Sequence, residues 1–238
     1  SLGEREMADI RGQEIAIIFQ NPSLSLNPIM KVAEQVAEPL QIHRRLPRHR
    51  AISKAEDMLS RLKLGDKASS AMYPFQLSGG MNQRVMIATS MILSPKILIA
   101  DEPSKGLDQS LARQVMKELA GIKDEIGASL LLITHDLLLA KEVSDRIAVM
   151  YCGEIVEAGS SAEIFDEPLH PYTKALLNCL PEMGFKPIPG SSPSMIDPPE
   201  GCRFYPRCRE RLDRCLLSPK MIKVESDDGD REVRCWLY

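Results

Sequence analysis

The chain has 238 residues, of which 44% are hydrophobic and 26% are charged, and its formal net charge is −3. This length suits one large domain, or one domain with an appendage, of an ordinary globular protein. The charge balance argues against a nucleic-acid partner. No apolar run reaches the roughly 18 residues of a membrane-spanning helix, so any role at a membrane would be that of a peripheral subunit.

The first half of the chain predicts a short strand followed by helices. A buried strand is expected over 15–19, ending at Gln20 before a turn signal. Apolar residues then recur at helical spacing over about 30–64 and again over about 81–93. We therefore expect a helical subdomain over about 22–93, inserted after the first strand.

The second half alternates strands with helices. Apolar runs over 96–100 and 129–134 predict buried strands, and an amphipathic helix is expected between them over 110–126. Residues 146–157 have the pattern of a β-hairpin. Strands that alternate with helices predict an α/β fold with a parallel sheet.

The C-terminal part has a different composition. Residues 181–201 contain six prolines together with serine and glycine, which predicts a loop-rich segment. Two of the six cysteines, Cys152 and Cys179, stand alone and are expected to be buried apolar residues. The other four follow the proline-rich segment.

These four cysteines, Cys202, Cys208, Cys215 and Cys235, have five, six and nineteen residues between them. Four soft thiolates in one small loop-rich unit indicate a metal or cluster site. Zinc sites usually contain cysteine pairs with two to four intervening residues, and such pairs are absent from this sequence. The spacing favours an iron–sulfur cluster, and Zn²⁺ or reduced structural cysteines are the alternatives.

Polar residues stand where the predicted strands end. Asp101 and Glu102 follow one strand, His135 follows the next, and Gln20 follows the first. Ligands bind at this edge of α/β sheets, where an acid can hold Mg²⁺ and a second carboxylate can polarise water. A histidine can contact a phosphate or the attacking water. Taken singly, each residue also fits an ordinary surface or structural role.

The segment Leu77–Met81 has the composition of a phosphate-contacting helix start. Gly79 and Gly80 allow close backbone approach, Ser78 adds a hydroxyl group, and the following helix directs free N–H groups outward. Gln83 lies one turn further along. An ordinary helix N-cap explains the same residues when they are considered alone.

The order and spacing of these motifs resemble the nucleotide-binding subunit of ABC transporters over residues 15–160. The motifs in chain order are Phe19-Gln20, Leu77–Met81, Asp101-Glu102, Gly106-Leu107-Asp108 and His135. The resemblance implies an ABC ATPase core related to P-loop NTPases, with a parallel sheet flanked by helices and an inserted helical subdomain. We expect a partial ABC ATPase domain over 1–160 and a loop-rich, cysteine-containing extension over 161–238.

The resemblance also implies roles for the strand-end residues, with ATP and Mg²⁺ as cofactors. Gln20 matches the Q-loop glutamine, which contacts Mg²⁺ and water. Asp101 matches the acid that holds Mg²⁺, Glu102 the base that acts on water, and His135 the switch histidine.

In this family two subunits enclose two ATP molecules, and each site is shared. The signature residues contact the nucleotide held by the other subunit, and here they are Ser78, Gly79, Gly80 and Gln83. Asp108 lies in the loop that forms part of the dimer interface. Met81 departs from the usual Gln or Glu of the signature.

Further segments resemble the oligopeptide, dipeptide and nickel importer branch. They are Asn27-Pro28, Arg84–Ala88, His170–Thr173 and the four-cysteine tail. In some members of that branch such cysteines hold a [4Fe–4S] cluster. The branch implies a second ABC ATPase subunit, identical or different, and membrane permease subunits as partners. A solute-binding protein acts indirectly, and the subunit lies on the cytoplasmic face of the membrane.

One motif of the family is missing from the sequence. The phosphate-binding Gly-x-x-x-x-Gly-Lys-Ser/Thr loop occurs nowhere in the 238 residues. We expect either a truncated chain or a degenerate half, and in both cases no ATP hydrolysis by this chain alone. The alternative function is that of a regulatory or interaction protein whose cysteine tail senses redox state.

Overall fold

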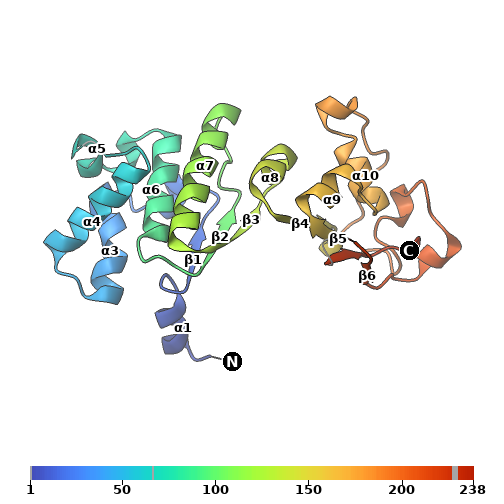
Figure 1. The fold of residues 1–238 in the computed structure, drawn as a ribbon, viewed down its shortest axis with the longest axis horizontal. Helices are drawn as coiled ribbons and strands as arrows, with labels where there is room; N and C mark the ends of the chain where they lie inside the picture. The colour runs from blue at the N-terminus through green and yellow to red at the C-terminus, as the bar shows by residue number, and fades with distance from the viewer. Residues whose placement is uncertain (1, 66, 227–229) are drawn as a thin grey trace. The chain divides into compact units, whose positions relative to one another are not determined.

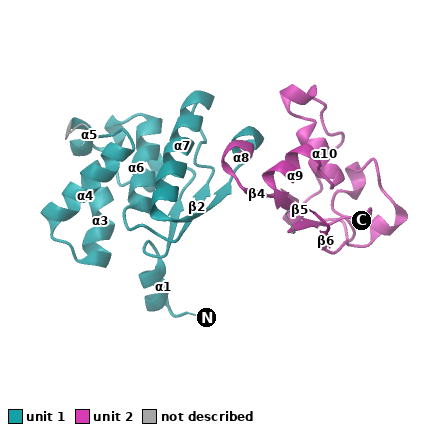
Figure 2. Cartoon of the chain, viewed as in Figure 1, with its two compact units in different colours: residues 1–139 teal, residues 140–238 magenta. Residues whose placement is uncertain are grey.

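The chain forms two compact units, residues 1–139 and 140–238 (Figure 2). This computed structural model describes residues 2–65, 67–226 and 230–238. The boundary expected at residue 160 falls inside the second unit, because strand β5 (Glu154–Ser160) pairs with β7 (Arg231–Val233) of the tail. Within the described ranges, no helix combines the length and apolar character that a membrane crossing requires.

The sheet of the first unit contains three parallel strands in the order β1-β2-β3 (Figure 1). They are β1 (Ile15–Ile18), β2 (Ile97–Asp101) and β3 (Ser129–Ile133). Each strand begins and ends within a residue or two of the predicted bounds. Because all three run in one direction, their carboxyl ends lie along one edge of the sheet.

Helices fill the segment between β1 and β2, as the sequence predicted. The helices of this unit are α1 (Glu4–Ile10), α2 (Pro22–Ser25), α3 (Val32–Arg44), α4 (Arg48–Arg61), α5 (Lys67–Ala71), η1 (Pro74–Gln76), α6 (Gly79–Met91) and α7 (Gln109–Ile126). Helix α8 (Leu137–Val143) spans the division between the units. Pro47 separates α3 from α4, and Gly127 ends α7 in the left-handed conformation that glycine adopts readily.

The two faces of the parallel sheet differ in burial. Ala16, Ile18, Leu98 and Ala100 are buried on one face, and α6 packs against β1. On the other face Ile17, Ile97, Leu131 and Ile133 are between 42 and 56% exposed. Parallel sheets are normally covered on both faces, so this apolar face is an unusual feature of the first unit.

The second unit is built around an antiparallel sheet in the order β4-β5-β7-β6. Strand β4 (Arg146–Tyr151) forms the predicted hairpin with β5. Cys152 and Gly153 form its two-residue turn, with φ of 45° and 79°, as such tight turns require. The tail contributes β6 (Ile222–Val224) and β7, which the sequence did not predict.

Short helices cover this second sheet. They are α9 (Ser161–Asp166), α10 (Pro171–Leu177), η2 (Pro181–Met183), η3 (Tyr205–Arg207) and η4 (Asp213–Leu216). The core of the unit consists of Val149, Tyr151, Val156, Ile164 and Phe204. Phe204 lies two residues after Cys202, so the cysteine-containing loops are anchored in this core.

Candidate functional site

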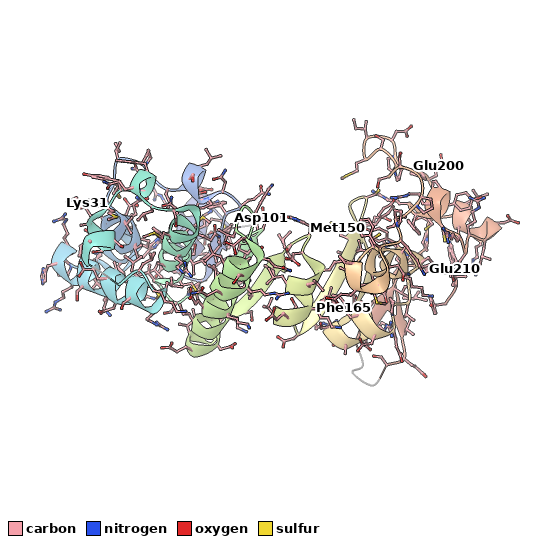
Figure 3. The ribbon with its side chains drawn as sticks, turned by 90° about the horizontal axis from the view of Figure 1, so that it is seen from above. Lys31, Asp101, Met150, Phe165, Glu200 and Glu210 are labelled. Atoms are coloured by element: carbon pink, nitrogen blue, oxygen red, sulfur yellow. The ribbon has the colours of Figure 1, made fainter. Side chains whose placement is uncertain are left out.

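The carboxyl edge of the parallel sheet brings the strand-end residues together. Asp101 is the last residue of β2 and pairs with Ile133 of β3 in the parallel register, and its position is labelled in Figure 3. His135 lies two residues after β3, and Gln20 lies two residues after β1. Asp101, His135 and Gln20 are all exposed.

Glu102 and His135 are in direct contact at this edge. His135 Nδ1 lies 2.6 Å from Glu102 Oε1. A carboxylate oxygen accepts hydrogen bonds, so this contact is a hydrogen bond in the tautomer that carries its proton on Nδ1. The Glu102 side chain is 18% exposed and that of His135 is 77% exposed. The Glu102 carboxylate is therefore mostly covered, whereas its histidine partner is open to solvent.

The backbone at Glu102 has an uncommon conformation. Its φ is +47°, in the left-handed region that residues other than glycine rarely occupy. The Glu102 N–H donates to the Ile133 carbonyl at 2.8 Å, which holds the peptide against β3. This bend directs the carboxylate towards the end of β3, where His135 lies.

The signature segment begins α6, as the sequence predicted. The Ser78 hydroxyl accepts a hydrogen bond from the Met81 N–H at 3.3 Å and caps the helix. A Cβ atom at Gly79 would have nothing within 4 Å, whereas one at Gly80 would lie 2.6 Å from Leu111 Cδ2 of α7. Gly79 therefore keeps the outer surface open, and Gly80 allows α6 and α7 to approach closely.

Gln83 lies beneath this surface. Its side chain is 1% exposed, and its Nε2 has no hydrogen-bond partner within the described part of the chain. The exposed residues of the signature are thus Ser78 and Gly79.

A carboxylate that the sequence analysis did not identify connects the two helices. Glu118 of α7 pairs with Arg84 of α6 at 2.9 Å and with Lys63 at 2.8 Å. Burial alone would raise the pKa of Glu118, but hydrogen bonds from Arg84, Lys63 and Gln114 outweigh it and lower the pKa. At the start of α7 the Asp108 carboxylate caps the helix by accepting from the Leu111 N–H at 3.0 Å. The helix starts that bear Ser78 and Asp108 are therefore joined by packing and by an ion pair.

In the second unit the four tail cysteines line one small cavity. Cys202, Cys208, Cys215 and Cys235 share its wall with His170, and the Cys202 N–H donates to the Cys215 carbonyl at 2.9 Å. Burial raises the pKa of Cys202, of Cys208 and, to about 11, of Cys235, so these thiols are neutral near pH 7. Across the residues that the structure describes, no three or more His, Cys, Asp or Glu side chains are arranged to hold a metal ion.

A buried ionic network supports that cavity. Glu157 is fully buried and accepts from the backbone N–H groups of Leu169 and His170, at 2.7 and 2.9 Å, and from Arg231 at 3.3 Å. His170 Nδ1 accepts from the Tyr172 N–H at 3.0 Å, and its ring also hydrogen-bonds to the Arg234 backbone. Burial lowers the pKa of His170 to about 4, so the ring is neutral.

Comparisons with known proteins identify both units. Residues 2–105 match the family model "ABC transporter", and residues 156–215 match "Oligopeptide/dipeptide transporter, C-terminal region". The oligopeptide transport ATP-binding protein AppD of Bacillus subtilis (strain 168) is 41% identical over 246 residues, which span 100% of this chain and 74% of AppD. The dipeptide transport ATP-binding protein DppD of Caldanaerobacter subterraneus is 40% identical, with 100% of this chain and 74% of DppD covered.

Solved structures of an ABC transporter cassette share the fold of this chain. The dimeric post-hydrolysis structure of the ATP-binding cassette MJ0796 bound to ADP and Pi matches with a TM-score of 0.61 and 29% identity, over 68% of each chain. A second dimeric structure of MJ0796, described as a bacterial ABC transporter cassette, matches with a TM-score of 0.60 and 29% identity, over 67% of this chain and 68% of that one. These matches confirm the predicted ATPase fold with its parallel sheet flanked by helices.

Proposed function

Because the chain belongs to the ATP-binding subunits of oligopeptide and dipeptide ABC transporters, we propose that it is an energy-coupling subunit of an importer for short peptides. Nickel is the other solute that its branch suggests. The observation that carries the proposal is the contact of Glu102 with His135 next to Asp101 at one sheet edge. Such a subunit would lie on the cytoplasmic face of the membrane, beside permease subunits.

The strand-end residues have chemistry that suits ATP hydrolysis. Asp101 and Gln20 are the residues that would hold Mg²⁺, which neutralises phosphate charge when it is bound. The Glu102 carboxylate would accept the proton of an attacking water, and His135 keeps that carboxylate in one orientation. With Nδ1 in contact with Glu102, the Nε2 atom of the exposed His135 ring would contact a phosphate oxygen.

The signature would serve a neighbouring subunit. Ser78 and Gly79 are exposed at the start of α6, where N–H groups and the helix dipole favour a phosphate. Gln83 is buried and would support the signature from beneath without touching the nucleotide, and Asp108 would lie at the subunit contact. The ion pair of Arg84 with Glu118 supports joint movement of these two helix starts.

The sequence contains no phosphate-binding loop with Gly-Lys-Ser or Gly-Lys-Thr, so we expect no ATPase activity from the isolated chain. In a complex with a second ABC ATPase subunit, this chain would supply its signature to the nucleotide of that subunit. The test is phosphate release from ATP by the purified chain and by the membrane complex that a tagged chain recovers, with its permease subunits identified by mass.

We expect the complex to hydrolyse ATP, and Ser78→Ala to lower its rate about tenfold, the usual effect of losing one hydrogen bond to a charged group. Ser110→Ala, an exposed serine in the first turn of α7, is the matched control. ATPase activity of the isolated chain that Glu102→Gln abolishes would contradict this account. Recovery of a soluble complex without permease subunits would favour the alternative, a regulatory protein.

We further propose that the four tail cysteines bind an iron–sulfur cluster. Four thiols line one cavity, and the ring nitrogens of the adjacent His170 are engaged by the backbone of Tyr172 and Arg234, which leaves sulfur as the donor set. Thiols release their protons when they bind a metal, so binding of a cluster would depend on pH. Such a cluster would cross-link the tail loops when it is bound.

Iron and acid-labile sulfide analysis of anaerobically purified protein tests this second proposal. We expect brown protein with iron and sulfide, both of which Cys235→Ser removes while the control Cys179→Ser retains them. Colourless protein with one zinc per chain would assign Zn²⁺ instead. Protein with neither metal would make these cysteines structural.

A further inference from the structure

A second cavity of the C-terminal unit has a different lining from the cysteine cavity. It has a volume of about 370 Å³ and is bordered by Arg207, Arg209 and Arg211 together with the Pro189-Gly190 turn. No Asp or Glu lines it, and Cys208 is the only residue that it shares with the cysteine cavity.

Arg207 makes one wall of this cavity rigid. Its guanidinium donates to the carbonyls of Ile188 and Pro189 at 3.0 and 2.9 Å, to the Ser192 hydroxyl at 3.1 Å and to the Tyr151 hydroxyl at 3.3 Å. These bonds hold the proline-rich segment against η3. Arg207 is therefore a structural residue whose positive charge remains near the cavity.

Arg209 and Arg211 are in a different situation. Both are exposed, and neither forms an ion pair in the part of the chain that the structure describes. The Arg211 guanidinium lies over the Tyr205 ring, 5.8 Å from its centre, which leaves its N–H groups available. Glu210, labelled in Figure 3, lines the cysteine cavity instead.

We propose that this cavity is an anion-binding site for a phosphate group, with Arg209 and Arg211 as its ligands. Planar guanidinium groups match phosphate oxygens in charge and bidentate geometry, and three positive charges without a lining carboxylate disfavour a neutral or cationic occupant. The phosphate can belong to a small molecule or to a lipid headgroup. The site contains none of the residues proposed for ATP hydrolysis, and it shares only Cys208 with the cysteine cavity.

The experiment is calorimetric titration of the full chain with inorganic phosphate, at ionic strength held constant with chloride. Arg209→Gln/Arg211→Gln removes two charges, and Arg44→Gln/Arg50→Gln removes two exposed arginine charges from the first unit as the matched control. All four side chains are exposed, and circular dichroism checks that each variant is folded. A parallel arm measures co-sedimentation with phosphatidylglycerol vesicles and with phosphatidylcholine vesicles.

We expect saturable phosphate binding that weakens at least tenfold in the Arg209/Arg211 variant and is unchanged in the control. Preferential sedimentation with phosphatidylglycerol that only the Arg209/Arg211 variant loses would support the site with a headgroup as its natural source. The proposal is overturned if neither phosphate nor anionic vesicles bind. Equal weakening in both variants would also overturn it, because general charge would then explain the binding.

Discussion

The two units assemble their candidate functional residues in different ways. In the first unit, Asp101, Glu102 and His135 meet because parallel strands end at one edge. In the second unit, the cysteines lie on loops around one cavity, and the buried pair of Glu157 and Arg231 links β5, β7 and the start of α10 beside it. A sheet edge gathers residues by strand direction, whereas a loop-built cavity depends on a few buried contacts. Changes to the network should therefore disturb the second unit far more than comparable changes disturb the first.

The largest expected effect comes from breaking that network. Glu157→Ala leaves Arg231 buried without its carboxylate, which should destabilise the second unit by about 3–5 kcal/mol. Trp236, the single tryptophan of the chain, reports on this unit by fluorescence during urea unfolding. Hydrogen exchange in α7 should stay unchanged. Glu182→Ala, at an exposed position, is the control, and a similar loss in both variants would argue against the network's role.

The second largest effect should be a fall in the stability of the second unit at low pH. The pKa of His170 in the folded chain is about 4, against an ordinary value of 6.5. The contribution of the neutral ring to folding stability is therefore fully present above pH 6.5. Between pH 6.5 and 4, His170 binds a proton in the unfolded chain but not in the folded chain. The free energy of unfolding should therefore fall by about 3 kcal/mol over this range. Trp236 fluorescence against urea at several pH values measures this slope, which His170→Gln should flatten. An unchanged slope in the variant would assign the effect to other groups.

In the first unit the two signature glycines should differ. Gly80→Ala places a Cβ atom 2.6 Å from Leu111 Cδ2, at the end of a side chain that can turn aside, and should destabilise the unit by about 1 kcal/mol. Gly79→Ala meets nothing within 4 Å and should be neutral or stabilising by up to about 1 kcal/mol. Urea unfolding followed by circular dichroism compares the pair. If both substitutions had the same effect, the close approach of α6 and α7 would not be needed for stability.

The smallest effect should come from an exposed ion pair. Lys96 and Glu14 lie 2.7 Å apart, with side chains 78 and 46% exposed, and Lys96→Ala should change stability by less than about 0.5 kcal/mol. The same urea experiment measures it. A loss of stability comparable to that of Glu157→Ala would mean that an exposed ion pair matters as much as the buried pair of Glu157 and Arg231.

The sequence could place residues that follow a predicted strand, but not residues that are held by distant ion pairs. Asp101, Glu102 and His135 could be placed at one edge because each follows an apolar run, and strand direction does the rest. Glu118 and Glu157 could not, because their arginine partners lie 34 and 74 residues away and no periodic pattern marks such pairs. Strands β6 and β7 have only three residues each, too few for an alternating pattern. The pairing of β5 with β7 could not be predicted from the sequence for this reason.

The left-handed backbone at Glu102 has a consequence for engineering this chain. Glycine adopts a φ of +47° without strain, so Glu102→Gly should make the protein more resistant to heat while it removes the carboxylate next to His135. A library selected only for thermal resistance would therefore accumulate variants without this acid. Because the proposed ATPase role depends on this carboxylate, a selection scheme for this chain should keep Glu102 fixed.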